Sequence, residues 1–84
     1  MGSYKDNQLT FQNAQRATKD VKDLLNMLDV HGSDYGHQLK QLKKEINEAF
    51  QQIDSAMVIA SEHQRVELEG YQSELQSMYN QIEE

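Results

Sequence analysis

The stretch AMVIASEHQRVEL, residues 56–68, decides whether the second half of the chain forms one helix or two. Before it, apolar residues recur in alternating steps of four and three, which is the spacing of one face of an α-helix. Those residues are Tyr35, Leu39, Leu42, Ile46, Ala49, Ile53, Ala56 and Ala60. The same phase would next bury His63 and Glu67, whereas the apolar stripe resumes out of phase at Leu68. One straight helix therefore cannot bury both stripes on the same side.

A capping box within this stretch predicts where one helix ends and the next begins. Ser61 followed by Gln64 matches the S-x-x-Q pattern, in which each side chain bonds the backbone amide of the other residue. Glu62 would lie in the first turn of the new helix, where the helix dipole favours an acidic side chain. We therefore predict a break at Ser61. The alternative is a helical hairpin or one long helix over residues 34–82, which would form a coiled-coil dimer.

Two further apolar stripes accompany the central one. The first consists of Ala14, Ala17, Val21, Leu24 and Leu28, flanked by Phe11 and Leu25. The last consists of Leu68, Tyr71, Leu75, Met78 and Ile82, with Tyr79 beside it. The predicted helices cover roughly residues 5–29, 34–60 and 62–82. Their matched lengths and short connections predict one all-α domain over residues 1–84, an antiparallel three-helix up-down-up bundle. The methionines expected to fill gaps in its core are Met27, Met57 and Met78.

The connection between the first two helices, LDVHGSDYGH at residues 28–37, is rich in residues that end and start helices. Gly32 is placed to take the left-handed conformation that terminates a helix. Ser33 or Asp34 can accept a hydrogen bond from the first free amides of the next helix. The prediction for this segment is therefore a helix stop, a cap and a helix start.

The alternative function for the same segment is a divalent-metal site. Its ligands would be Asp29, His31, Asp34 and His37, which offer the nitrogen and oxygen donors that zinc accepts. Their spacing matches no strong metal-binding template, so His31 and His37 are only weak metal candidates. We expect no metal and no cofactor. We also expect no catalytic residues, because nothing supplies an oxyanion hole or a pocket beside Ser61 and His63.

The composition argues against several classes of protein. The net charge is −6, which disfavours nucleic-acid binding because phosphate contacts need clustered Lys and Arg. No apolar run approaches the roughly 20 residues that span a bilayer, so we expect no membrane segment. The chain has no Cys, which excludes disulfides and Cys-type zinc sites and fits a reducing compartment such as the cytoplasm.

Charge is also distributed unevenly along the chain. The basic residues before Ile46 are Lys5, Arg16, Lys19, Lys22, Lys40, Lys43 and Lys44, whereas Arg65 alone follows it, among eight acids. The acidic third helix is therefore a candidate surface for a basic partner, and Val66, Glu69 and Tyr79 are its candidate partner-binding residues. A second candidate is an apolar strip left open by the short first stripe. We expect a non-enzymatic protein that acts through protein–protein interaction or self-association.

The order of these features resembles a known family. A short helix, a Tyr-containing turn, a long helix and the segment SEHQRVELEGYQSELQSMYNQI are similar to the YtzC-like family, small helical proteins of Bacillus-type spore-forming bacteria. The likeness rests on Asp34 and Tyr35, Gln64-Arg65, Leu68 and the run Leu75-Gln76-Ser77. It extends over most of the chain and implies a soluble bacterial cytoplasmic protein without an assigned activity. It supplies no functional residues, but it implies a polar break before the Gln-Arg pair.

Overall fold

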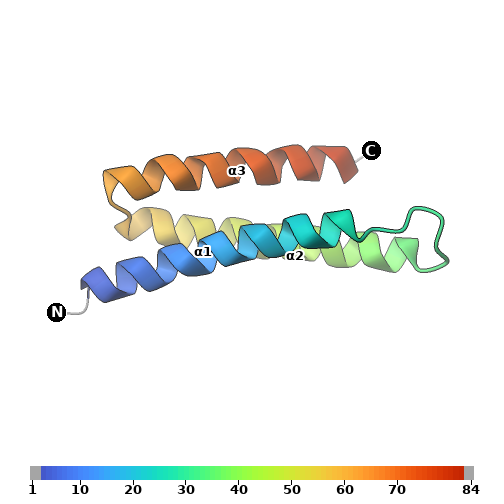
Figure 1. The fold of residues 1–84 in the computed structure, drawn as a ribbon, viewed down its shortest axis with the longest axis horizontal. Helices are drawn as coiled ribbons and strands as arrows, with labels where there is room; N and C mark the ends of the chain where they lie inside the picture. Colours follow the sequence, from blue (N-terminus) through green and yellow to red (C-terminus); the bar gives the residue numbers. More distant parts are fainter. Residues whose placement is uncertain (1–2, 83–84) are drawn as a thin grey trace.

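Three helices packed along one another account for nearly all of the described chain (Figure 1). The computed structural model describes the backbone of residues 3–82 and the side chains of residues 8–82. Helix α1 spans Ser3–Asn26, α2 spans Tyr35–Ile59 and α3 spans Glu62–Ile82. Helices α1 and α3 run in the same direction, and α2 runs against both. The predicted all-α up-down-up bundle is thereby confirmed for these residues.

The junction between α2 and α3 is the break that the sequence predicted. Ala60 leaves the helical path with φ −75° and ψ 145°, an extended conformation. The Ser61 amide donates to Oε1 of Gln64 at 3.1 Å, and the Gln64 amide donates to Oγ of Ser61 at 3.2 Å. This reciprocal pair is a capping box. The alternative of a hairpin or one continuous helix over residues 34–82 is therefore wrong.

The core lies along the inner face of α2, between α1 and α3. Its buried apolar residues are Ala14, Val21, Leu42, Ile46, Ala49, Ile53, Ala56, Leu68, Leu75, Met78 and Ile82. All of them belong to the three predicted stripes. The buried polar residue that the sequence analysis missed is Thr18, which is 2% exposed and donates its hydroxyl to the carbonyl of Ala14 at 2.9 Å. Because that hydroxyl is bonded within its own helix, its burial leaves no polar group without a partner.

The bundle is long and thin, with extents of 50 × 19 × 15 Å. Helices of 24 and 25 residues rise about 1.5 Å per residue, so α1 and α2 set most of this length. Helix α1 packs along α2 more extensively than along α3. A cross-section of three helices is filled by the core side chains.

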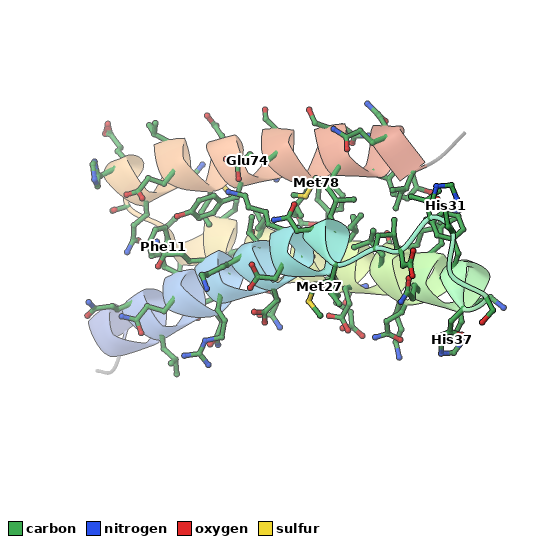
Figure 2. All side chains as sticks on the ribbon, turned by 45° about the vertical axis from the view of Figure 1, so that its right-hand side comes forward. Phe11, Met27, His31, His37, Glu74 and Met78 are labelled. Atoms are coloured by element: carbon green, nitrogen blue, oxygen red, sulfur yellow. The ribbon has the colours of Figure 1, made fainter. Side chains whose placement is uncertain are left out.

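Helix α1 ends earlier than predicted, and this changes the position of Met27. The Met27 amide is shared between the carbonyls of Asp23 and Leu24, both at 3.1 Å, and the Leu28 amide bonds the Leu25 carbonyl at 3.3 Å. These tighter bonds end the helix at Asn26 rather than at residue 29. Met27 is 72% exposed, and Figure 2 shows its side chain on the side of α1 away from α3. The prediction that Met27 fills the core is wrong, whereas Met57 and Met78 do pack in or against it.

Candidate functional site

Asp29 organises the loop between α1 and α2. Its carboxylate Oδ1 accepts a hydrogen bond from the His31 amide at 3.2 Å, which is a local Asx-type turn. Its own amide donates to Oε1 of Gln38 in α2 at 3.1 Å. The Gly32 amide closes the turn by donating to the Asp29 carbonyl at 3.1 Å. Asp29 therefore connects the loop to the first turn of α2 and has a complete structural role.

Two details of the predicted turn are wrong. No described glycine has a positive φ, so Gly32 does not take the left-handed conformation. A Cβ at Gly32 would instead lie 2.7 Å from Oδ2 of Asp29, so a larger residue there would require the Asp29 side chain to shift. Asp34 does occupy the N-cap position of α2, but its side chain makes no capping hydrogen bond. The loop is held by Asp29, which lies six residues before Tyr35, the first residue of α2.

The loop does not bring its two histidines together. Figure 2 shows His31 and His37 projecting from opposite sides of the loop end of the bundle. Both side chains are exposed. No group of three or more His, Cys, Asp or Glu side chains in the described part of the chain is arranged to hold a metal ion. Zinc sites in proteins use three or four protein ligands, and the geometry offers no such set around His31 or His37.

His63 is also a surface residue. Its side chain is 89% exposed, and Nε2 lies 3.3 Å from Oε2 of Glu67, one helical turn away. An exposed i,i+4 pair of this kind contributes a few tenths of a kcal/mol, about 0.3–0.5, when the histidine is protonated. Ser61 is occupied by the capping box. Ser61 therefore caps α3, and His63 pairs with Glu67 on the helix surface.

Two of the grooves on the described surface lie between helices. One lies between α1 and α2 at the loop end, has a volume of about 170 Å³ and is lined by Leu24, Met27, Leu28, His37, Gln38 and Gln41. The other lies between α1 and α3, has a volume of about 370 Å³ and is lined by Lys22, Leu25, Asn26, Glu74, Ser77 and Met78. The Lys22–Glu74 ion pair, with a distance of 2.9 Å from Nζ to Oε1, spans the second groove. The first groove is smaller than typical small-molecule sites of about 300–1,000 Å³, and the second is open to solvent.

The predicted partner-binding residues on α3 differ in accessibility. Val66 is 68% exposed and Glu69 is exposed. Tyr79 is half-buried and packs against the core, so it is less accessible to a partner than the other two. Its position next to Met78 on the apolar stripe of α3 explains this. Val66 and Glu69 therefore remain the accessible candidates of the three.

Further exposed apolar side chains were missed by the sequence analysis. They are Leu9, Met27, Val30, Val58 and Ile59, of which Val58 is 79% exposed. The signal that could have found Val58 is its phase: it is an aliphatic residue on the face of its helix opposite the apolar stripe. Aliphatic residues in such positions contribute nothing to the core. The packing of the core therefore does not account for these exposed aliphatic side chains.

Comparison with known proteins identifies no relative of this chain. No family model, no curated protein and no solved structure matches the chain. The resemblance to the YtzC-like family therefore stays a prediction. Within the described residues, no helix has the length and apolar character that crossing a membrane requires. The residues that bear on function are therefore the exposed side chains of the bundle.

Proposed function

We propose that this protein is a non-enzymatic interaction module that binds another protein through side chains on the outside of its helices. The observation that carries the proposal is the exposure of Val58 and Val66, at 79% and 68%. Each valine lies on the face of its helix that is turned away from the core of the bundle. The absence of Cys and the resemblance stated above support a cytoplasmic setting in a bacterium.

The energetics of helices support a role in binding for these two valines. A β-branched residue at an exposed helix position loses side-chain freedom, and it is less favourable than Ala by up to about 0.7 kcal/mol. Neither valine recovers this cost by burial in the fold. Burial against a partner would recover about 1.5–3 kcal/mol for each fully covered side chain. The gain on binding therefore exceeds the cost in the free protein.

Affinity capture from the native host tests this proposal. The wild-type chain is compared with a Val58→Ser, Val66→Ser double variant, and Met27→Ser serves as the matched control because Met27 is equally exposed at the other end of the bundle. We expect the wild type and the control to enrich the same protein, and the double variant to lose it. Failure of the wild type to enrich any protein would contradict the proposal, and so would equal recovery with all three baits.

Self-association is the second candidate, and the groove between α1 and α2 favours it. Leu24, Met27 and Leu28 line this groove, and the exposed Val30 follows in the loop. Residues 17–46, the α1 and α2 segments that surround this groove, carry five basic and five acidic side chains, so a contact confined to them involves no net repulsion. Light scattering over a concentration series tests it: we expect a rise in mass that Met27→Ser abolishes, and a constant monomer mass refutes it.

A further inference from the structure

The groove between α1 and α2 at the loop end shows which faces of these two helices lie side by side. Leu24 and Met27, at the end of α1, line it together with His37 and Gln41 of α2. Figure 2 shows Met27 on the side of α1 away from α3. The groove therefore marks the side of the α1–α2 pair that lies opposite α3.

Helical periodicity extends this side along α1. An α-helix completes five turns in about 18 residues, so Leu9 lies in line with Met27, whose amide still bonds the Asp23 carbonyl at 3.1 Å. Arg16 lies seven residues after Leu9, and Asp20 lies seven residues before Met27. Seven residues are two turns to within about 20°, so these residues share one face of α1. All are exposed, Leu9 at 58% and Met27 at 72%.

The same periodicity applies to α2. Ile59 lies 18 residues after Gln41, and Lys44 and Glu48 follow Gln41 in steps of three and four. These four residues are also exposed, Ile59 at 42%. Both rows of residues begin at the groove, and α1 packs along α2, so the rows flank the same seam. We define the seam face as these two rows, which are Leu9, Arg16, Asp20 and Met27 of α1 and Gln41, Lys44, Glu48 and Ile59 of α2.

Charge alternates between the two rows of the seam face. The first charged residues of the rows, counted from the groove, are Asp20 on α1 and Lys44 on α2, and one turn further lie Arg16 and Glu48. At each level one row is therefore acidic and the other is basic, and the signs are exchanged at the next level. None of these four side chains forms an ion pair with another described side chain. The seam face thus presents both signs of charge without a net charge.

We propose that the seam face is the contact between two copies of this chain, related by a two-fold axis that runs along the bundle. This inference rests on the second candidate for the proposed function, self-association, and specifies its surface and geometry. Rotation about that axis places α1 of each copy against α2 of the other. Asp20 then lies opposite Lys44 of the second copy, and Arg16 lies opposite its Glu48. Each contact occurs twice, as in every isologous dimer.

The apolar residues of the seam face also meet in this arrangement. Leu9 lies opposite Ile59 of the second copy, and Met27 lies over the groove of the second copy, beside its Gln41. The fold of a single copy leaves Leu9, Met27 and Ile59 exposed. The dimer removes their apolar surface from water, which favours association.

Charge complementarity favours a second copy over other occupants. A nucleic acid would place phosphates against Asp20 and Glu48, and a uniformly basic or acidic helix would meet a like charge at alternate levels, which costs affinity. A copy rotated about an axis perpendicular to the bundle would set each helix against the same helix of the other copy. Glu48, near the middle of its row, would then approach Glu48 of the second copy.

The size of the seam face indicates how stable the dimer is. Its rows are about 27 Å long at about 1.5 Å per residue, and two helices packed about 8–10 Å apart make it roughly 18–20 Å wide. Two copies would bury about 1,000 Å² in total, which is the lower limit for a specific interface. We therefore expect a reversible dimer that dissociates on dilution.

Reversing one charge in each row tests the arrangement on the full chain. Light scattering at low salt over a concentration series gives the dimer dissociation constants of the wild type, Asp20→Lys and Lys44→Glu. Each variant alone should dimerise about tenfold or more weakly, because two like-charged contacts replace two attractive ones. An equimolar mixture of the two variants should restore the wild-type affinity, because both contacts of the mixed dimer again join opposite charges. Added salt should narrow these differences.

Matched controls make the same changes outside the seam face. Glu69→Lys and Arg65→Glu alter exposed residues of α3 by the same steps of charge and should leave the dissociation constant unchanged. Leu9→Ser should weaken the dimer about tenfold, because it removes two apolar contacts at the end far from the groove, whereas Val66→Ser on α3 should not. An unchanged affinity for Leu9→Ser rejects a contact over the full length of the face. Circular dichroism verifies that each variant keeps its helices.

The remaining outcomes overturn the inference in distinguishable ways. A wild type that stays monomeric rejects both self-association and the seam face. A dimer that Met27→Ser abolishes and that the charge reversals leave unchanged retains self-association and rejects the seam face. Reversals that weaken the dimer without restoration in the mixture reject the axis along the bundle, and an equal loss with Glu69→Lys rejects the inference in favour of an effect of net charge. Capture of a host protein through Val58 and Val66 stands or fails independently of these results.

Discussion

Replacing Ser61 with Ala tests whether the capping box determines the junction between α2 and α3. In the native structure Oγ of Ser61 accepts the Gln64 amide at 3.2 Å, and Oε1 of Gln64 accepts the Ser61 amide at 3.1 Å. Ser61→Ala removes the first bond and leaves an amide of the first turn of α3 without its side-chain acceptor. Loss of an N-cap serine costs about 1 kcal/mol, within a range of about 0.5–2 kcal/mol.

That loss is large for a domain of this size. A chain of 84 residues is stable by roughly 4–13 kcal/mol, at about 0.05–0.15 kcal/mol per residue. One kcal/mol corresponds to a fall of about 4–8 °C in melting temperature for a domain of this length. Urea unfolding followed by far-ultraviolet circular dichroism measures it. Because the two bonds are reciprocal, we expect Gln64→Ala and Ser61→Ala to be coupled by about 0.5 kcal/mol or more in a double-mutant cycle.

The same substitution elsewhere on α3 has the opposite expected sign, which makes it the matched control. Ser73 is an exposed residue in the interior of α3, where Ala is the better helix former by up to about 0.5 kcal/mol. Ser73→Ala should therefore be neutral or slightly stabilising. If Ser61→Ala stabilises the protein as Ser73→Ala does, then Ser61 behaves as a helix-interior residue, and the reasoning that places a cap and a break there is refuted.

Three further predictions concern the core, the glycines and metal binding. Ile53→Ala should lower the free energy of unfolding by about 2–5 kcal/mol because Ile53 is fully buried. Val58→Ala should instead be neutral or stabilising by up to about 0.7 kcal/mol, and similar losses for both variants in urea unfolding would contradict the assignment of the core. Gly32→Ala should lower the melting temperature, because its Cβ would displace the Asp29 carboxylate from the hydrogen bond that it accepts from the His31 amide. Gly70→Ala should stabilise the protein by about 1 kcal/mol, because a Cβ added at Gly70 would meet no other atom within 4 Å. The reverse order of melting temperatures would refute this. Zinc or a chelator should leave the melting temperature unchanged, since the described residues include no group of three ligands, and a zinc-dependent rise would show a site that the geometry does not.

Most of the fold could be predicted from the sequence, because the apolar residues that recur at helical spacing are the residues that pack in the core. The stripe from Leu42 to Ala56 is buried in full, as its spacing predicted. The phase shift before Leu68 predicted that no straight helix could continue through the junction. The pairing of Ser61 with Gln64 is local in the chain, so its geometry could be predicted without knowledge of any distant residue.

The loop could not be predicted in the same way because its conformation depends on contacts between elements. Gly32 matches the pattern of a left-handed helix terminator, yet its backbone has no positive φ, and the close approach of Asp29 explains the glycine instead. The bond from the Asp29 amide to Gln38 joins residues on either side of the loop, and no local pattern encodes it. For the same reason the sequence left a metal site at His31 and His37 as an alternative, whereas the structure separates the two side chains.

The sequence by itself determined that this chain forms three amphipathic helices, where the second gives way to the third, and which apolar stripes form the core. Those properties follow from periodicity and from bonds between near neighbours, which are local in the chain. Only the tertiary structure decided which apolar side chains stay outside, because exposure depends on where a helix ends and on which neighbour covers it. That difference left Tyr79 half-buried, exposed Met27, and left Val58 and Val66 accessible on the outer faces of α2 and α3.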